Sequence, residues 1–419
     1  MTVARIRGIA SSTTDTRDAR LIPVGGGRRP AFSSIPTVLL LIFAIAPASR
    51  IGHAEPPTVD LAGPDEARLR EVVGRLASPE FQGRSGAGGR KAADFLVEEF
   101  RRLRLEPMTP GGYIQQIPPK EPGDALQGRN VGGILRGLDP KLKDEWIVLG
   151  THFDHLGVRD GVLYPGADDN ASGVAMMLEV ARSLTSHKSK PLRSVLFLGF
   201  DLEEIGLFGS RYFVAHPTIP LDRISLFLTA DMIGRSLAGV CEEDVFVFGT
   251  EHSPAVRPWI LEAAAGKPLS VGLLGADLLV LNRSDYGPFR SRNVPFLFFT
   301  TGENPRYHSP RDDAASLNYP KLTAISRLID QVVRRAASAP ESPKWISTPD
   351  NPLQEAVAIR KVLRQLLENQ ERLKIGTTQL FLMKNTVRSL DEIIARDTIT
   401  PAERARIIQA ARIILFTVI

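Results

Sequence analysis

The chain has 419 residues, 43% of them apolar and 24% charged, which is ordinary for a soluble globular protein with one large core or one core and a small appendage. Its formal net charge of +5 lies in residues 1–54, where seven arginines face two aspartates, so the remainder is formally neutral and a basic nucleic-acid-binding surface is excluded. Cys241 is the only cysteine, which excludes an intramolecular disulfide and a thiolate-rich zinc site.

Residues 1–54 have the parts of a secretory signal peptide. Two arginines at positions 28 and 29 precede an apolar run at 37–46, and small residues at 46–48 and at 52–54 both fit a cleavage pattern, of which we favour the second. The alternative is an uncleaved membrane anchor, but the apolar run is short against the roughly 20 residues that a spanning helix needs. We therefore predict a secreted or periplasmic protein with no stable membrane association after the leader is removed.

The first elements after the leader are helical. A proline-containing linker at 55–63 precedes helical periodicity at 64–76, and a second amphipathic stretch follows at 90–103. The glycine-rich segment 82–89 between them lacks both a preceding strand and the Gly-Lys-Ser/Thr ending of a phosphate-binding loop. We therefore predict a flexible loop at 82–89.

From residue 130 onward, short apolar and β-branched runs alternate with helical stretches. The predicted strands are 130–135, 146–150, 195–200, 226–230, 245–248 and 294–299, and residues 172–184 have helical spacing. Apolar strands separated by helices predict an α/β fold with a mixed, largely parallel central sheet and helices on both faces. In such sheets, ligands bind at the carboxyl ends of the strands.

The composition changes again after residue 340. A linker at 342–352 precedes helical periodicity at 353–373, 378–396 and 401–415, and the last of these begins with a capping box at 400–403. We predict a main domain at 55–340 and a C-terminal helical extension at 341–419. The extension is expected to pack on the main domain or on a second subunit.

Three polar clusters fall at the carboxyl ends of predicted strands or at the start of the following helix. The first holds His152 and Asp154, the second Asp168 and Asp169, and the third Asp201, Glu203 and Glu204. Alone, each of the first two would be explained by a hydrogen-bonded loop pair or a helix cap. Consecutive acids after a buried strand, however, cost desolvation energy unless a cation faces them.

Two further strand ends complete this pattern. Asp231 follows the strand at 226–230, and Tyr307 and His308 follow the strand at 294–299. Histidines and carboxylates on four strand ends, without a thiolate, predict a zinc site in which cobalt or manganese are substitutes.

These clusters resemble the motifs of the M28 family of co-catalytic zinc exopeptidases. The motifs are His152-Phe-Asp154, Gly166-Ala-Asp-Asp-Asn-Ala-Ser-Gly173, Phe200-Asp-Leu-Glu-Glu-Ile-Gly-Leu-Phe-Gly-Ser210, Ala230-Asp231-Met-Ile-Gly and Tyr307-His308-Ser-Pro-Arg-Asp312. The resemblance covers roughly residues 69–322, including Ser78-Pro-Glu-Phe-Gln-Gly-Arg-Ser85. Five motifs in order are far more specific than one short motif.

The resemblance implies two zinc ions and a role for each motif residue. Asp168 would bridge the ions, His152 and Asp231 would complete one of them, and Glu204 and His308 would complete the other. Glu203 would be the general base and Asp154 would orient His152. A cis peptide is expected between Asp168 and Asp169.

Tyr286 departs from the family pattern, because many members have Ser-Asp-His where this chain has Ser-Asp-Tyr at 284–286. Its hydroxyl either donates a hydrogen bond to the developing oxyanion or only packs. The remaining histidines lie outside the matched positions and are predicted to be surface or loop residues: His155, His187, His216 and His252. Asp312 and Asp313 are expected to shape a loop rather than bind metal.

The resemblance implies an exported aminopeptidase that acts on peptides, with Glu203 as general base on a metal-bridging water. The alternatives are a carboxypeptidase or dipeptidase of the same family, a glutaminyl-cyclase-like relative, and a non-catalytic peptide-binding protein. The complete ligand set favours hydrolysis over cyclisation, and the retention of Glu203 and Glu204 argues against a degenerate site. The oligomeric state is left open.

Overall fold

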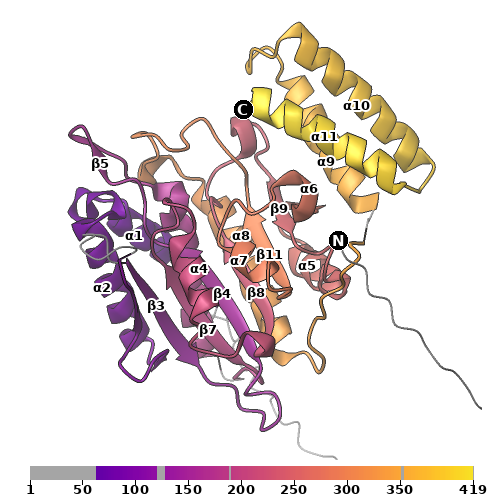
Figure 1. Ribbon diagram of the computed structural model, residues 1–419. Helices are drawn as coiled ribbons and strands as arrows, with labels where there is room; N and C mark the ends of the chain where they lie inside the picture. Colours follow the sequence, from indigo (N-terminus) through magenta and orange to yellow (C-terminus); the bar gives the residue numbers. More distant parts are fainter. Residues whose placement is uncertain (1–62, 120–127, 188–189, 351–352, 419) are drawn as a thin grey trace, which may run out of the picture. The chain divides into compact units, whose positions relative to one another are not determined.

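The computed structural model describes residues 63–119, 128–187, 190–350 and 353–418 (Figure 1). The predicted leader, with both of its cleavage patterns, lies outside the described residues. Among the helices that are described, none is both long enough and apolar enough to cross a membrane.

A nine-stranded sheet forms the centre of the fold, in the order β1-β3-β7-β4-β8-β11-β9-β10, with β2 also paired to β3. Its strands are β1 (Glu106–Pro107), β2 (Ile114–Ile117), β3 (Gly128–Leu135), β4 (Trp146–His152), β7 (Ser194–Phe200), β8 (Ile224–Ala230), β9 (Asp244–Phe248), β10 (Ser270–Leu274) and β11 (Phe296–Thr300). The neighbours β7, β4, β8 and β11 run parallel, as do β9 and β10. Strand β3 is antiparallel to β7, and β11 is antiparallel to β9, so the predicted mixed, largely parallel sheet is confirmed.

Helices cover both faces of the sheet because successive strand residues point to opposite sides (Figure 1). In β7, Val195 and Phe197 join one hydrophobic core, whereas Leu196 and Leu198 join the other. The first core includes residues of α1 (Glu66–Leu76), α2 (Ala87–Arg102), α3 (Gly173–Ser186), α5 (Arg257–Ala264) and α8 (Tyr319–Ser338). The second includes residues of α4 (Phe208–Ala215), α6 (Ala276–Leu279), α7 (Tyr286–Arg290) and the C-terminal helices.

The C-terminal extension packs on the last strand of the sheet. It consists of α9 (Leu353–Glu368), α10 (Thr377–Ala395) and α11 (Pro401–Val418), and α9 contacts β10. Lys361 Nζ donates to Asp244 at 2.8 Å, and the Gly275 amide donates to Glu355 at 2.7 Å. Of the two expected placements, the structure therefore has the one on the main domain.

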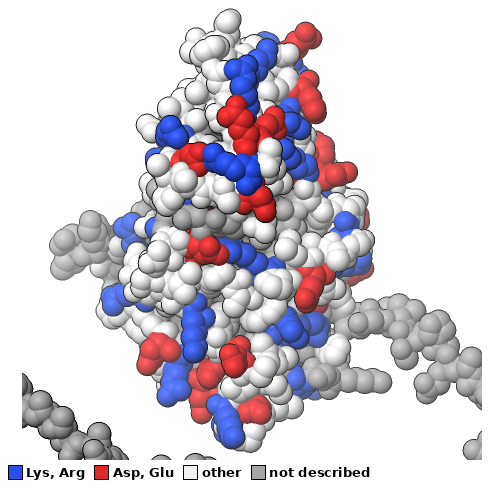
Figure 2. Space-filling model, turned by 90° about the vertical axis from the view of Figure 1, so that its right-hand side faces the viewer, with Lys and Arg blue, Asp and Glu red and all other residues white. Residues whose placement is uncertain are grey.

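Basic and acidic side chains are interspersed on the face of the molecule that Figure 2 shows. On the helical extension, Arg360 and Arg364 both pair with Asp391, at 3.1 and 2.8 Å. Such exposed pairs contribute little to stability but break up fields of a single sign.

The glycine-rich segment 82–89 is ordered, so the prediction of a flexible loop is wrong. It comprises the end of a 3-10 helix, Pro79–Arg84, and the beginning of α2. The side chain of Arg84 is fully buried. A small hairpin, β5 (Val158–Arg159) and β6 (Val162–Leu163), lies nearby, where the Gly157 amide donates to the Gly83 carbonyl at 3.0 Å.

Candidate metal centre

Side chains from three strand ends and from the helical turn Ala167–Ser172, which precedes α3, converge into two groups with the composition of metal sites. One group is His152, Asp169 and Asp231, and the other is His155, Asp169 and Glu204. Within each group, the ligand atoms lie within 4.8 Å of one another. The groups meet because β7, β4, β8 and β11 are parallel neighbours, so their carboxyl ends share one edge of the sheet.

The first group fits a tetrahedral divalent cation. His152 Nε2 lies 3.4 Å from Asp169 Oδ1 and 3.4 Å from Asp231 Oδ1. Ligand atoms about 2.1 Å from a tetrahedral zinc ion lie about 3.4 Å apart. His152 Nε2 and Asp231 Oδ1 are buried and have no hydrogen-bond partner. Such unpaired buried atoms are costly, and a bound cation would satisfy both.

The second group surrounds Glu204. His308 Nε2 lies 3.1 Å from Glu204 Oε2 and 3.1 Å from Asp169 Oδ2. On its other oxygen, Glu204 is 2.7 Å from His155 Nδ1. Burial raises the pKa of Glu204, but the hydrogen bonds with His155 and His308 outweigh it and hold this pKa below its ordinary value. Glu204 is therefore kept as a carboxylate, which is the form that binds metal.

His155 is the residue that the sequence interpretation missed. It lies in the loop after β4, within the expectation of a surface or loop position, but its side chain is buried against Glu204 and its Nδ1 lies 3.8 Å from Asp169 Oδ2. The spacing His152-x-x-His155 directly after a buried strand was the signal that could have indicated it. His252 lies in a loop, as expected, and its side chain is buried, with its ring stacked on Trp345.

The shared carboxylate belongs to Asp169, which corrects the assignment of the bridging role to Asp168. Both oxygens of Asp168 are engaged elsewhere: the Gly234 amide donates to Oδ1 at 2.7 Å and Asn304 Nδ2 donates to Oδ2 at 3.2 Å. The two oxygens of Asp169 instead face His152 and His308. The cis peptide lies between Asp169 and Asn170 rather than between Asp168 and Asp169.

Asp154 holds both His152 and the acidic segment after β7. Its Oδ1 lies 3.6 Å from His152 Nδ1, whose nearer neighbour is the Asp154 carbonyl oxygen at 3.3 Å. The amides of Glu203 and Glu204 donate to its two carboxylate oxygens at 3.0 and 3.3 Å. Asp154 therefore fixes the positions of a candidate ligand and of the candidate base together.

Glu203 lies in an environment that favours its protonated form. Burial raises the pKa of Glu203 well above its ordinary value; Asp231 and Asp285 raise it further, and His152 opposes them. A buried carboxyl group with a raised pKa is typical of groups that transfer protons in active sites.

Two neighbouring side chains hold the candidate ligands in place. Ser284 Oγ donates to Asp231 Oδ2 at 2.9 Å, which leaves Asp231 Oδ1 directed at His152. Asp312 accepts from the amides of Asp168 and Asp169 at 3.0 and 3.1 Å. Asp312 thereby holds the backbone of the segment 168–169.

Tyr286 does not reach the candidate centre. Its ring is buried and stacked on Phe296 and Phe298, and its hydroxyl donates to the Leu281 carbonyl at 2.5 Å. The structure therefore supports packing and contradicts an oxyanion role. Tyr307 is the tyrosine at the centre, since its ring stacks on His308 with 3.8 Å between centroids. Burial raises the pKa of Tyr307, as do the nearby carboxylates of the two groups.

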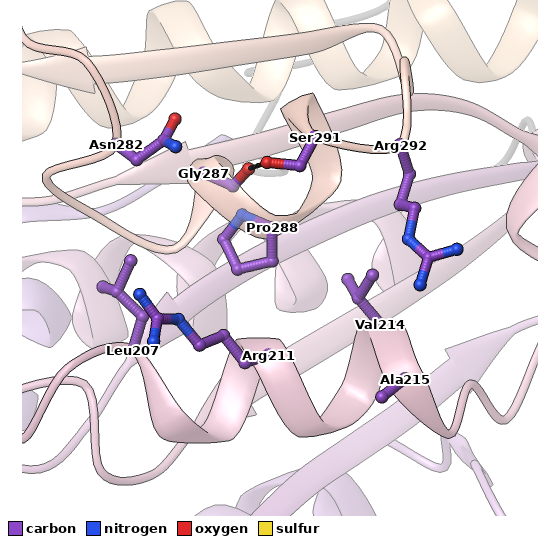
Figure 3. A pocket seen from close by; sticks show the side chains of 9 residues that line it. All are labelled: Leu207, Arg211, Val214, Ala215, Asn282, Gly287, Pro288, Ser291 and Arg292. Atoms are coloured by element: carbon purple, nitrogen blue, oxygen red, sulfur yellow. Dashed lines mark hydrogen bonds between the residues drawn. The ribbon is translucent and has the colours of Figure 1, made fainter. Parts of the chain in front are cut away.

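A separate hollow of about 250 Å³ lies between α4 and α7 (Figure 3). Leu207 and Arg211 line one side, and Pro288, Ser291 and Arg292 line the other. The residues of the two ligand groups are not among those that line it, so this hollow is distinct from the candidate metal centre.

Comparisons with known proteins agree with this geometry. Residues 130–333 match the model of peptidase family M28. Aminopeptidase YwaD of Bacillus subtilis (strain 168) is 27% identical over 271 residues, and the alignment covers 58% of this chain and 57% of that protein. This chain thus spans little more than half the length of that relative.

Two solved structures share the fold. The LapA aminopeptidase of Legionella pneumophila matches with a TM-score of 0.53 and 22% identity, over 66% of this chain and 73% of that chain. Porphyromonas gingivalis glutaminyl cyclase matches with a TM-score of 0.53 and 21% identity, over 64% of this chain and 97% of that chain. With a matching family model and two groups of metal-ligating side chains at the carboxyl edge of the sheet, this chain belongs, through residues 130–333, to the metallopeptidases of family M28.

Proposed function

We propose that this metallopeptidase is an exported di-zinc aminopeptidase that removes N-terminal residues from peptides. The observation that carries the proposal is that Asp169 belongs to both ligand groups. The amide of Glu203 is hydrogen-bonded to Asp154, which lies beside His152. His152 and Asp231 would complete one zinc ion, and Glu204 and His308 the other. The ligands are imidazoles and carboxylates, which suit zinc and leave cobalt and manganese as substitutes.

The reaction divides between the metal and the side chains. When bound, two zinc ions would polarise the scissile carbonyl and would make a water acidic enough to be deprotonated near neutral pH. Glu203 accepts the proton from the attacking water and delivers it to the leaving amine. Asp154 keeps Glu203 in position through the Glu203 amide. The hydroxyl of Tyr307 is the candidate hydrogen-bond donor to the developing oxyanion.

The direction of cleavage and the export of the protein are supported by observations outside the metal centre. The aminopeptidase direction is supported by the aligned relative, which is an aminopeptidase. Export is supported by the signal-peptide pattern of residues 1–54, and mass spectrometry of the secreted N-terminus tests it. A mature protein that begins with the intact leader would contradict cleavage.

The test of activity is hydrolysis of a panel of aminoacyl-p-nitroanilides by the secreted protein as prepared, after chelation, and after zinc add-back. We expect cleavage that chelation abolishes and zinc restores, and we expect Glu203→Gln to keep its zinc and lose turnover. Cleavage of only N-blocked peptides with free carboxyl ends would instead indicate a carboxypeptidase. Conversion of only N-terminal glutaminyl peptides would indicate a cyclase, and zinc binding without any turnover would indicate a binding protein.

A further inference from the structure

Arg84 is a fully buried guanidinium whose hydrogen-bond partners are all backbone carbonyls. The five bonds run from Nε to Phe153 O at 2.8 Å, from Nη1 to Leu76 O at 3.1 Å and Pro165 O at 2.6 Å, and from Nη2 to Gly166 O at 2.6 Å and Asp169 O at 3.1 Å. A guanidinium has five N–H groups, and its planar shape fixes their directions. Its partners are therefore held at positions that the side chain dictates.

Four of these five carbonyls belong to segments that carry candidate ligands, and the fifth, that of Leu76, lies at the end of α1. Phe153 lies between His152 and Asp154, and the other contacted segment, 165–169, ends at the shared carboxylate of Asp169. The buried guanidinium of Arg84 thus links the end of β4 to the start of the turn before α3. Asp312 in addition accepts from the amide of Asp169. The segment that contains Asp169 is therefore held by Arg84 through its carbonyls and by Asp312 through its amides.

The backbone that delivers Arg84 adopts a conformation that side chains disfavour. Gln82, Gly83 and Arg84 are successive residues with positive φ, at 49°, 63° and 51°. For Gln82 and Arg84, the left-handed conformation is sterically disfavoured, because it brings Cβ too close to the following carbonyl oxygen. At Gly83, a Cβ would lie 2.6 Å from the carbonyl oxygens of Gly157 and Tyr164. Such strain persists where surrounding contacts fix it, and the five bonds of Arg84 do so here.

The charge of Arg84 by itself works against metal binding. Burial lowers the pKa of Arg84, while Asp169, Asp312, Asp154 and Glu204 raise it through space, so the carboxylates around the centre are its counterions. A cation beside the same carboxylates repels incoming zinc. If charge dominated, removing Arg84 would strengthen zinc binding. If its hydrogen bonds dominated, removing it would weaken zinc binding.

We propose that Arg84 is a positioning residue of the metal centre, which holds the segment 152–154 and the segment 165–169 at the spacing at which His152 and Asp169 share a metal ion. The inference rests on the zinc centre of the proposed function. Its physical basis is that groups hydrogen-bonded behind metal ligands orient them, and their loss lowers metal affinity about 10–100-fold.

The experiment measures zinc stoichiometry and affinity by competition with a chromophoric chelator, together with the visible spectrum of the cobalt-substituted protein. The variants are Arg84→Lys, which keeps the charge and loses the fork, and Arg84→Met, which loses both. The matched control is Arg193→Lys. Arg193 is also buried, but it donates to Glu145 and to the Ala336 and Ala339 carbonyls, at the amino-terminal end of β7.

We expect both Arg84 variants to bind zinc about 10–100-fold more weakly and to show altered cobalt spectra. Arg193→Lys should lower Tm while its zinc affinity stays at that of the unmodified protein. Unchanged zinc affinity in Arg84→Lys, with a loss of Tm like that of Arg193→Lys, would show a structural role only and overturn the inference. Tighter zinc binding by Arg84→Met would also overturn it, and Arg84→Lys decides if Arg84→Met does not fold. Failure of the unmodified protein to bind two zinc ions would instead refute the proposed zinc centre.

Discussion

Separate substitutions of the adjacent residues Asp168 and Asp169, which precede α3, distinguish which of the two is the bridging ligand. Asp169→Asn removes the charge from the side chain whose oxygens lie 3.4 Å from His152 Nε2 and 3.1 Å from His308 Nε2. Asp168→Asn is the matched control, because its oxygens accept from the Gly234 amide and from Asn304. The side chains differ by one position in the sequence and are both buried.

The expected magnitude follows from linkage between metal binding and folding. At free zinc of 100 times Kd, each site contributes about 2.7 kcal/mol to the free energy of unfolding, or about 5 kcal/mol for two sites. Loss of a shared charged ligand should weaken each site by at least about 100-fold, since loss of groups behind ligands already costs about 10–100-fold. At the same free zinc, each site then contributes about 0.4 kcal/mol.

The assay is zinc content after dialysis, together with the difference in unfolding free energy between zinc-loaded and metal-free protein. Asp169→Asn should lose most of this difference, and Asp168→Asn should retain it. The metal-free form of Asp169→Asn should not lose stability, because burial and the nearby Glu204 raise the pKa of Asp169 and make its charge costly. Two tightly bound zinc ions in Asp169→Asn, with loss of zinc in Asp168→Asn, would refute the assignment to Asp169.

Three further predictions concern side chains around the centre. His155→Ala should lower zinc affinity about 10–100-fold at the site that contains Glu204, as measured by chelator competition. Unchanged zinc affinity would contradict a role for His155 in holding Glu204. Tyr307→Phe should lower kcat about 100-fold. Tyr286→Phe should keep kcat but lose about 1 kcal/mol of unfolding free energy, because its hydrogen bond to the Leu281 carbonyl is lost. Equal kcat values for the two variants would contradict the oxyanion role of Tyr307. Burial raises the pKa of Asp201 and Asp285 to about 7, so the folded chain holds more protons than the unfolded chain between pH of about 4 and 7. The Tm of the metal-free protein should therefore fall as pH rises through this window. A Tm that rises with pH would contradict the raised pKa values of Asp201 and Asp285.

Much of the fold follows from the sequence because hydrophobic periodicity is local. The strands expected at 146–150, 195–200 and 226–230 lie within β4, β7 and β8, since buried parallel strands are continuous apolar runs. The same pattern placed His152, Glu204 and Asp231 at the carboxyl edge of the sheet. What it did not determine was the antiparallel pairing of β3, because pairing direction depends on which strand lies beside it.

The direction of side chains in irregular segments was decided by the tertiary structure alone. Asp168 and Asp169 are adjacent and chemically identical, and what separates them is that Gly234 and Asn304, far along the chain, hydrogen-bond to the first. His155 is directed at Glu204 by a turn whose conformation no periodicity describes. The buried fork of Arg84 shows the same limit, since its partners at 76, 153 and 165–169 come together only in the folded chain. The sequence thus determined which chemical groups reach this edge of the sheet, and long-range hydrogen bonds determined which of them face one another.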